Sequence, residues 1–120
     1  MSGKNLIFNN LLQSIKNRGA AHIVLLDPDR KDEESLGERI ENANNAGVDA
    51  LFVGGSLMMD LNCEDRVKKI KSLSKIPVIL FPGGTGQLNS HYDAILFMSV
   101  ISGRNPHYLI GEQVLAAPIV

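Results

Sequence analysis

The stretch LFPGGTGQLNSHYDAILFMS, residues 80–99, places a glycine-rich loop between two apolar runs. Both runs are typical of buried strands, and the link between them has almost no room for a helix. The glycines and the lack of charge indicate that something approaches the loop backbone closely. Two interpretations remain open: a slim loop beside a long apolar or phosphorylated ligand, or a flexible connection that replaces a missing helix.

Working outward, the chain repeats a pattern of apolar run and amphipathic segment. The predicted strands cover residues 21–27, 49–56, 76–84 and 93–99. Unbroken apolar runs of this length are typical of strands buried on both faces of a parallel sheet. The predicted helices cover residues 5–16, 32–47, 63–75 and 105–118, and the last begins with Asn105 as N-cap and Pro106 at its first position.

Apolar spacing predicts which face of each helix is buried. The expected inward residues are Leu6, Ile7, Leu11, Leu12 and Ile15 in the first helix, Leu36, Ile40 and Ala43 in the second, and Val67, Ile70 and Leu73 in the third.

Alternating strands and helices predict right-handed crossovers and a parallel sheet. A doubly wound sheet would place a G-x-G-x-x-G turn after its first strand, and LLDPDRKD, residues 25–32, does not contain one. A complete (β/α)8 TIM barrel needs about 250 residues, and four strands in 120 residues are half of that. We therefore predict one α/β domain over residues 1–120, the N-terminal half of a (β/α)8 barrel.

The composition argues against several classes of protein. A formal net charge of −1 argues against a general nucleic-acid surface. No apolar run approaches the roughly 20 residues of a membrane span, and the first 19 residues lack the pattern of a signal peptide. The single cysteine, Cys63, cannot form an internal disulfide, so we expect a reducing compartment, the cytoplasm.

Two strand ends carry side chains that suit a metal or a phosphate. Asp27 follows the first strand, and a carboxylate there is a candidate ligand for Mg²⁺ shared with substrate phosphates. Ser56 follows Gly54 and Gly55, which would let a phosphate approach backbone N–H groups. Ordinary turn chemistry is the alternative: Asp27 would cap a proline turn and Ser56 would cap the next helix. Neighbouring parallel strands would bring both residues to the same edge.

Taken as an ordered set, four stretches resemble the geranylgeranylglyceryl phosphate synthases and their bacterial PcrB-like relatives. They are LLDPD (25–29), AGVDALFVGGS (46–56), PVILFPGGTGQL (77–88) and DAILFMSVISGRNPHYLIGEQVLAAP (93–118). The resemblance runs from about His22 to Val120. Its most specific part is ISGRNPHYLIG followed by AAP, because the barrel fold in general does not require that sequence.

The resemblance implies a prenyltransferase on a (β/α)8 barrel. Such enzymes join a prenyl diphosphate, geranylgeranyl diphosphate, to the 3-hydroxyl of sn-glycerol 1-phosphate, forming an ether and releasing diphosphate with Mg²⁺. Asp27 matches the metal-binding aspartate of the family and Ser56 its metal-binding hydroxyl. Members are commonly oligomeric, so the resemblance also implies a homo-oligomer.

Two departures from the family pattern bear on activity. Leu25 stands where some bacterial relatives carry a lysine that contacts glycerol phosphate. The sequence ends at Val120, before the family's YLEAGSGA-like segment with its acidic residue and before its phosphate-binding loops. We therefore expect no catalytic residue in this fragment and no turnover by it alone. We also expect either self-association or a place within a larger fold, or that these residues are part of a longer protein.

Two other functions remain open at this point. One is a generic phosphate-binding barrel enzyme that acts on a sugar phosphate and needs no long apolar groove. The other is a non-catalytic half-barrel that serves as an assembly module. The helix predicted over residues 105–118 is a candidate self-association surface for that module.

Overall fold

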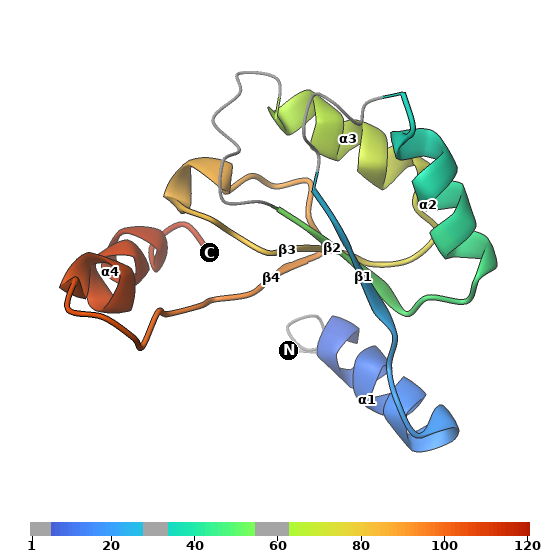
Figure 1. Cartoon of the computed structure of the whole chain (residues 1–120), viewed down its shortest axis with the longest axis horizontal. Coiled ribbons are helices and arrows are strands. Elements are labelled where there is room, and N and C mark those ends of the chain that lie inside the picture. The colour runs from blue at the N-terminus through green and yellow to red at the C-terminus, as the bar shows by residue number, and fades with distance from the viewer. Residues whose placement is uncertain (1–5, 28–33, 55–62) are drawn as a thin grey trace.

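The computed structural model describes residues 6–27, 34–54 and 63–120, and its core is one parallel sheet (Figure 1). The four strands are β1 (Ile23–Leu26), β2 (Ala50–Val53), β3 (Val78–Leu80) and β4 (Ala94–Ile95). They lie side by side in sequence order, β1-β2-β3-β4, and every neighbouring pair is parallel. This order and direction are those of consecutive strands in a (β/α) barrel, as the sequence predicts.

Helices α2 (Leu36–Asn45) and α3 (Cys63–Leu73) lie side by side over one face of the sheet (Figure 1). Each begins with acidic side chains in its first turn, which suit the positive end of the helix dipole. The burial predicted for α2 is confirmed, because all three of its expected inward residues are buried.

The burial predicted for α3 is confirmed at two positions and wrong at the third. Val67 and Ile70 are fully buried, whereas Leu73 is 43% exposed. Leu73 is the last residue of α3, where the chain turns from the helix toward β3. A side chain at the end of a helix has neighbouring helical turns on one side only, so it is covered less than one in the middle.

The two faces of the sheet differ in how they are covered. One face packs against α2 and α3. The strand residues on this face are Leu26, Leu51, Val53 and Val78, with the partly buried Val24 beside them. Because side chains alternate along a strand, Leu25, Phe52 and Ile79 face the opposite way. We call this second face the inner face, since it would line the interior of a barrel.

The first strand differs from the prediction of burial on both faces. Of its four residues only Leu26 is buried, and Leu25 is 57% exposed. The reason is position: in the part of the chain that the structure describes, β1 is at the edge of the sheet and has a neighbour, β2, on one side only. A residue of an edge strand that points to the inner face is covered only when the barrel closes around it.

The fourth strand is shorter than the predicted span of residues 93–99. It pairs with β3 only through Ala94 and Ile95, and the Leu96 N–H then donates to the Leu80 carbonyl oxygen at 3.0 Å. Beyond that point the chain runs toward its last helical segment. The apolar run therefore reflects a second role of these residues, as a pocket wall.

The first helix, α1 (Leu6–Arg18), forms as predicted, but no residue on it is buried. It lies near the start of β1, away from α2 and α3 (Figure 1). Its C-terminal end is attached to the sheet by the Arg18 guanidinium, which pairs with Asp49 and donates to the Gly47 carbonyl oxygen at 3.4 Å. The expected burial of its apolar face is only partly met: Ile7 and Leu11 are half-buried, whereas Leu6, Leu12 and Ile15 are exposed.

The last helix begins at the predicted place but with different winding. Asn105 Oδ1 accepts the His107 N–H at 3.0 Å, as an N-cap does. The first turns, η3 (His107–Gly111), are π-helical, and α4 (Glu112–Ala116) follows without a break. Single π turns inside helices are frequent at functional sites.

Candidate functional site

The carboxyl ends of β1 and β2 lie at the same edge of the sheet. Leu26 is opposite Val53 in the parallel register, so the next residues, Asp27 and Gly54, leave the sheet side by side. Asp27 is exposed there. The structure thus places this predicted metal ligand at the edge where parallel α/β proteins bind ligands. Ser56 lies outside the described residues, so its place beside Asp27 remains a prediction.

Gly54 is needed for a reason that the sequence did not indicate. Its φ is +155°, and a Cβ added to it would lie 1.8 Å from the Phe81 carbonyl oxygen. The Gly54 N–H donates to the Leu26 carbonyl oxygen at 3.3 Å. This N–H is therefore committed to the strand ladder, and the glycine makes room for the end of β3. Gly55 lies outside the described residues, so the prediction that a phosphate approaches backbone N–H groups after Gly54 and Gly55 stays a prediction, to which the N–H of Gly54 itself does not contribute.

The donor chemistry at this edge fits Mg²⁺. Within residues 6–27, 34–54 and 63–120, no three His, Cys, Asp or Glu side chains are grouped as a metal cage. Mg²⁺ typically binds one or two carboxylates and completes its octahedron with water and substrate phosphates. The exposed Asp27 carboxylate is an oxygen donor of this kind.

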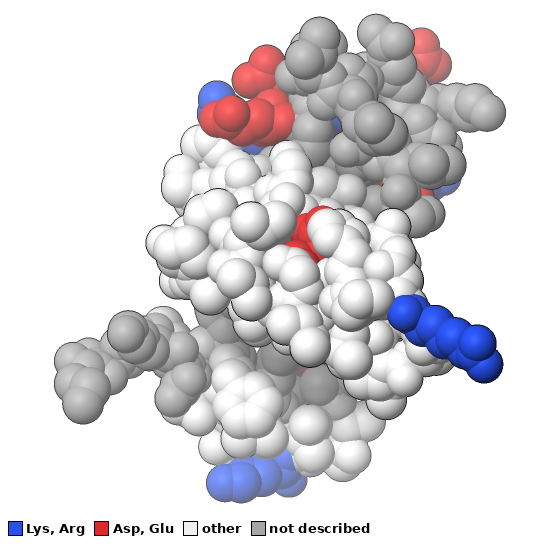
Figure 2. Space-filling view, turned by 90° about the vertical axis from the view of Figure 1, so that its left-hand side faces the viewer, with Lys and Arg blue, Asp and Glu red and all other residues white. Residues whose placement is uncertain are grey.

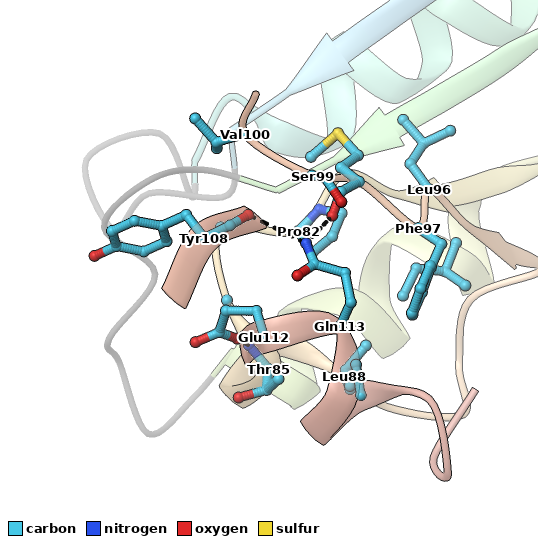
Figure 3. A pocket seen from close by; sticks show the side chains of 15 residues that line it. Pro82, Thr85, Leu88, Leu96, Phe97, Ser99, Val100, Tyr108, Glu112 and Gln113 are labelled. Carbon is cyan, nitrogen blue, oxygen red and sulfur yellow. Dashed lines mark hydrogen bonds between the residues drawn. The ribbon is translucent and has the colours of Figure 1, made fainter. Parts of the chain in front are cut away.

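A pocket of about 200 Å³ lies at the carboxyl ends of β3 and β4 (Figure 3). Its walls come from the glycine-rich loop at residues 82–88, the chain at 95–100 and the helix formed by η3 and α4. The apolar side chains that line it include Leu88, Ile95, Leu96, Phe97, Met98 and Val100. The stretch at residues 80–99 thus forms two of the walls, and the loop with almost no helix opens onto this space.

Glu112 joins the helix to the glycine-rich loop at the pocket wall (Figure 3). Its Oε2 accepts the Thr85 N–H at 3.1 Å, and its Oε1 lies 2.7 Å from His107 Nε2. Sequence reasoning missed this residue. The available signal was that Glu112 is the only acidic residue in the predicted helix at 105–118.

Two glutamine side chains hold segments that form the walls of the pocket. Gln113 Nε2 donates to the carbonyl oxygens of Met98, at 2.5 Å, and Tyr108, at 3.2 Å. Gln87 is buried, and its Oε1 accepts the Gly83 N–H at 2.9 Å. The loop also contains a short 3₁₀ turn, η2 (Thr85–Gln87). It is therefore held by its own hydrogen bonds, which favours a shaped wall over a flexible connection.

The side of the molecule that carries α4 is almost free of charge where the structure describes it. Figure 2 looks onto this side: an acidic group lies near the middle of the described surface, basic groups lie toward its right and lower margins, and acidic groups gather at its upper margin. The exposed large apolar residues here include Tyr108, Leu109, Ile110, Val114 and Leu115. An apolar ligand or an apolar protein surface matches such a side, and a polyanion does not.

The histidines do not meet in the structure. His91 Nε2 lies 3.0 Å from Glu64 Oε1, and this hydrogen bond is the main reason that the pKa of Glu64 is lowered, with Lys68 second. His107 pairs with Glu112, as described above, and His22 precedes β1 at the opposite end of the strands. The three histidines therefore lie at separate places and do not form a common site.

These features define a class before any relative is considered. The chain is half of a parallel (β/α) barrel, with a carboxylate at the carboxyl end of β1 and an apolar pocket at the carboxyl ends of β3 and β4. Ligands of such proteins bind at this end of the strands. The model of the PcrB family matches residues 12–120, and the chain belongs to that family.

Curated relatives share one name. The chain is 40% identical over 116 residues to the geranylgeranylglyceryl phosphate synthase of Chitinophaga pinensis, covering 97% of this chain and 46% of the relative. It is 41% identical over 104 residues to the enzyme of the same name from Aeropyrum pernix, covering 87% and 41%. The chain thus spans about half the length of the curated relatives it matches.

Solved structures confirm the fold. The (S)-3-O-geranylgeranylglyceryl phosphate synthase of Thermoplasma acidophilum, in complex with substrate sn-glycerol-1-phosphate, superposes with a TM-score of 0.80 at 32% identity. The match covers 95% of this chain and 46% of that one. The Thermoplasma volcanium protein gives 0.81, also at 32% identity. The predicted fold class, the N-terminal half of a TIM barrel, is confirmed.

Proposed function

We propose that this chain binds the metal ion and the prenyl chain of the substrate in a Mg²⁺-dependent prenyltransferase. The reaction joins geranylgeranyl diphosphate to the 3-hydroxyl of sn-glycerol 1-phosphate. The observation that carries the proposal is the apolar pocket at the carboxyl ends of β3 and β4, on the same edge of the sheet as Asp27. The name shared by the relatives, and the sn-glycerol-1-phosphate in the Thermoplasma acidophilum structure, support it.

The spacing of the strands suits a substrate with a charged head and an apolar tail. Neighbouring strands lie about 4.8 Å apart, so the end of β1 and the end of β3 are about 10 Å apart across the sheet edge. A diphosphate beside Asp27 would leave its prenyl chain directed over the ends of β2 and β3 toward the pocket. The apolar walls of the pocket then keep water away from the first part of that chain.

The reaction needs a group that neutralises the diphosphate and a base that takes the hydroxyl proton. The allylic C–O bond to the diphosphate breaks, and the glycerol hydroxyl oxygen forms the ether bond and gives up its proton. Mg²⁺ held by Asp27 and Ser56 would neutralise the negative charge that grows on the diphosphate. Because we assign no base for the proton within the chain, we propose that the chain binds the prenyl diphosphate but does not turn it over alone.

The location is proposed on the same basis. The described part of the chain contains no helix long and apolar enough to cross a membrane. The single cysteine suits a reducing compartment, and we propose the cytoplasm as the place where the protein works.

The test is binding of geranylgeranyl diphosphate, measured by calorimetry with and without Mg²⁺. We expect binding that requires Mg²⁺ and that Asp27→Ala weakens at least about tenfold, the loss of a charge-assisted contact. Glu41→Ala is the matched control, because it removes an exposed carboxylate from the middle of α2 and should leave binding unchanged.

Two outcomes would refute the proposal. One is binding that is the same with and without Mg²⁺, or the same in Asp27→Ala. The other is tight binding of a sugar phosphate without any binding of the prenyl diphosphate, which would favour a generic phosphate-binding barrel. An ether product formed by this chain alone, with sn-glycerol 1-phosphate added, would refute only the statement that it does not turn over.

A further inference from the structure

The π turn at the start of the last helix brings together two side chains that an α-helix would separate. In an α-helix, residues at the spacing of His107 and Glu112 lie about 140° apart around the axis. Here His107 Nε2 lies 2.7 Å from Glu112 Oε1. The Glu112 N–H donates to the His107 carbonyl oxygen, which is the hydrogen bond of a π turn, and this wider turn returns Glu112 to the side of His107.

Gly111 leaves room for the histidine ring. A Cβ added to Gly111 would lie 3.1 Å from His107 Nδ1, closer than an ordinary van der Waals contact. The backbone of Gly111 has φ −61° and ψ −50°, which any residue adopts in a helix, so no turn requires glycine there. The ring also packs edge-on against Tyr108, with 5.1 Å between the ring centroids. The neighbours of the His107 ring thus fix where it lies.

The Glu112 carboxylate is held at both of its oxygens. Oε1 faces His107 Nε2, and Oε2 accepts the Thr85 N–H at 3.1 Å. An ionised carboxylate only accepts hydrogen bonds, so His107 Nε2 must carry the proton of the first contact. A glutamate side chain loses rotamer freedom when it is fixed. The contact with His107 reduces the number of orientations from which Glu112 has to find Thr85.

We propose that His107 is a positioning residue for the pocket. It holds Glu112 in the orientation that accepts the Thr85 N–H, and so it fixes the glycine-rich wall against which the prenyl chain lies. The identity of that ligand rests on the proposed function, whereas the contact between helix and loop does not. His107 is not one of the residues that line the pocket, so it acts on a ligand only through Glu112.

Another histidine–glutamate pair shows the contrast. The Glu64 carboxylate that pairs with His91 is 59% exposed and also pairs with Lys68 along α3. Exposed pairs of this kind contribute little. The Glu112 side chain is only 25% exposed, and its second oxygen binds the backbone of a pocket wall.

The first measurement is amide hydrogen exchange at Thr85, by NMR on the chain without ligand. His107→Phe keeps an aromatic ring beside Tyr108 but removes the donor, and exchange at Thr85 should become about two- to fivefold faster. His107→Gln keeps an N–H donor and should restore most of the protection. His22→Phe is the matched control, because His22 is an exposed histidine at the opposite end of the strands, and it should leave Thr85 unchanged.

Two further variants test whether His107 acts through Glu112. His107→Phe should add nothing to the faster exchange of Glu112→Ala, because residues that act as one unit are not additive. Gly111→Ala should also speed exchange at Thr85, although alanine favours a helix, since the added Cβ displaces the ring. In the unaltered chain, a long-range ¹H–¹⁵N spectrum should show the proton on His107 Nε2.

Binding of geranylgeranyl diphosphate with Mg²⁺ then measures the effect on the pocket. His107→Phe should weaken it about two- to fivefold and should leave inorganic diphosphate binding unchanged. Unchanged exchange at Thr85 in His107→Phe would overturn the proposal. So would faster exchange that His107→Gln does not reduce, or an added effect in the Glu112→Ala background. Failure of the unaltered chain to bind the prenyl diphosphate would refute the proposed function and leave the exchange results as the test of His107.

Discussion

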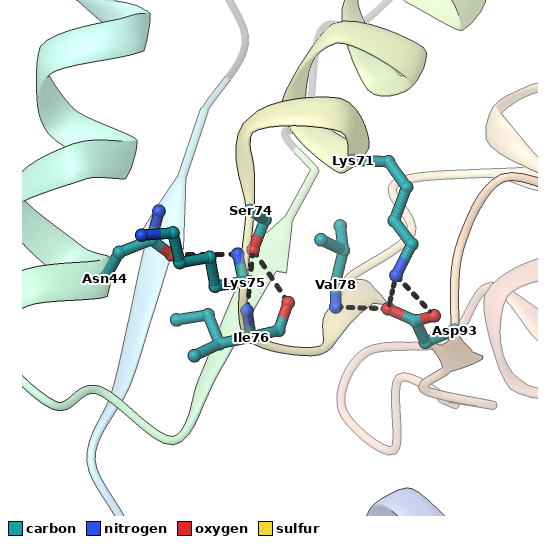
Figure 4. A network of polar contacts seen from close by, with 7 residues as sticks. All are labelled: Asn44, Lys71, Ser74, Lys75, Ile76, Val78 and Asp93. Atoms are coloured by element: carbon teal, nitrogen blue, oxygen red, sulfur yellow. Dashed lines mark hydrogen bonds and ion pairs between the residues drawn. The ribbon is translucent and has the colours of Figure 1, made fainter.

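Asp93 forms hydrogen bonds with both backbone groups of Val78, its N–H and its carbonyl oxygen. Its Oδ2 accepts the Val78 N–H at 2.8 Å (Figure 4). Its own N–H donates to the Val78 carbonyl oxygen, also at 2.8 Å. Lys71 Nζ, from the helix before β3, lies 2.6 Å from the carboxylate. One aspartate thus sets where β3 and β4 begin relative to each other.

The same arrangement recurs where β1 and β2 begin. Asp49 Oδ2 accepts the His22 N–H at 2.8 Å, its N–H donates to the His22 carbonyl oxygen at 2.8 Å, and Arg18 from the preceding helix pairs with it. The segments VDALF (48–52) and YDAILF (92–97) carry this repeated signal. The amino end of the sheet is therefore held by aspartates, while the carboxyl end is left to the candidate site.

Removing the Asp93 carboxylate should destabilise the chain. Asp93→Ala leaves the part-buried Val78 N–H without its acceptor, which costs about 1–3 kcal/mol of unfolding free energy. Urea denaturation followed by circular dichroism measures this change. Asp65→Ala is the control, because it removes an 81% exposed carboxylate that lies 3.6 Å from Lys68. Its unfolding free energy should change by no more than about 0.5 kcal/mol. Equal effects of the two variants would contradict the role given to Asp93.

The stability should fall at acid pH in a way that depends on Asp49. Hydrogen bonds from the Ser14 side chain and the His22 backbone N–H, with help from Arg18, lower the pKa of Asp49 from its ordinary value of 3.8. A lowered folded-state pKa gives stability that is present above 3.8 and is lost as the pH falls through the folded-state value. In Asp49→Asn the unfolding free energy should change less between pH 6 and pH 3, measured by urea titration at each pH. The same pH slope in both proteins would refute this prediction.

Gly54→Ala should destabilise the sheet strongly. The new Cβ would collide with the Phe81 carbonyl oxygen, and the φ of +155° is one that alanine rarely adopts. We expect a loss of about 2–4 kcal/mol of unfolding free energy, measured by thermal and urea unfolding. Gly37→Ala is a suitable comparison, because it lies in α2, where a Cβ meets nothing within 4 Å. It should be neutral or slightly stabilising.

Glu112→Ala should loosen the pocket more than Glu112→Gln. Alanine removes the acceptor of the Thr85 N–H, whereas glutamine keeps an oxygen that accepts it. We expect faster amide hydrogen exchange at Thr85 in the alanine variant, and weaker binding of geranylgeranyl diphosphate with the Mg²⁺ requirement unchanged. Identical exchange at Thr85 in both variants would show that Glu112 does not hold the loop.

A charge in the pocket should separate tail binding from head binding. Leu96→Asp places a carboxylate in the apolar wall and should weaken binding of geranylgeranyl diphosphate, because burying an unpaired charge is costly. Binding of inorganic diphosphate with Mg²⁺ should not change, since that ligand has no tail. Calorimetry with the two ligands makes the comparison. Equal weakening of both would place the tail elsewhere.

Several elements were predictable because their signal is local. The apolar spacing of Leu36, Ile40 and Ala43 predicted the buried face of α2, and Asn105 predicted the start of the last helix. The four strands were predicted from their apolar runs, although β4 is shorter than its run. Asp27 was predicted at a strand end and lies at the edge of the sheet where ligands bind in such folds.

Other features escaped prediction because they depend on residues far apart in the sequence. Glu112 acts across 27 positions on Thr85, and the need for glycine at position 54 comes from the carbonyl group of Phe81. The exposure of Leu25 depends on whether a strand lies beside β1, which an apolar run cannot report. In each case the sequence shows the type of residue but not the distant residue that it contacts.

The amino-acid sequence alone determined the kind of elements, their order, the half-barrel class and the family resemblance, because periodicity and short motifs are properties of neighbouring residues. Only the tertiary structure decided that residues 80–99 form two walls of a pocket, that Glu112 joins the third wall to them, and that β1 and β4 are the outer strands of the sheet among the described residues. These depend on which segments the parallel register brings together. The chain carries no local signal for such long-range contacts, since each is made only when the strands are already paired.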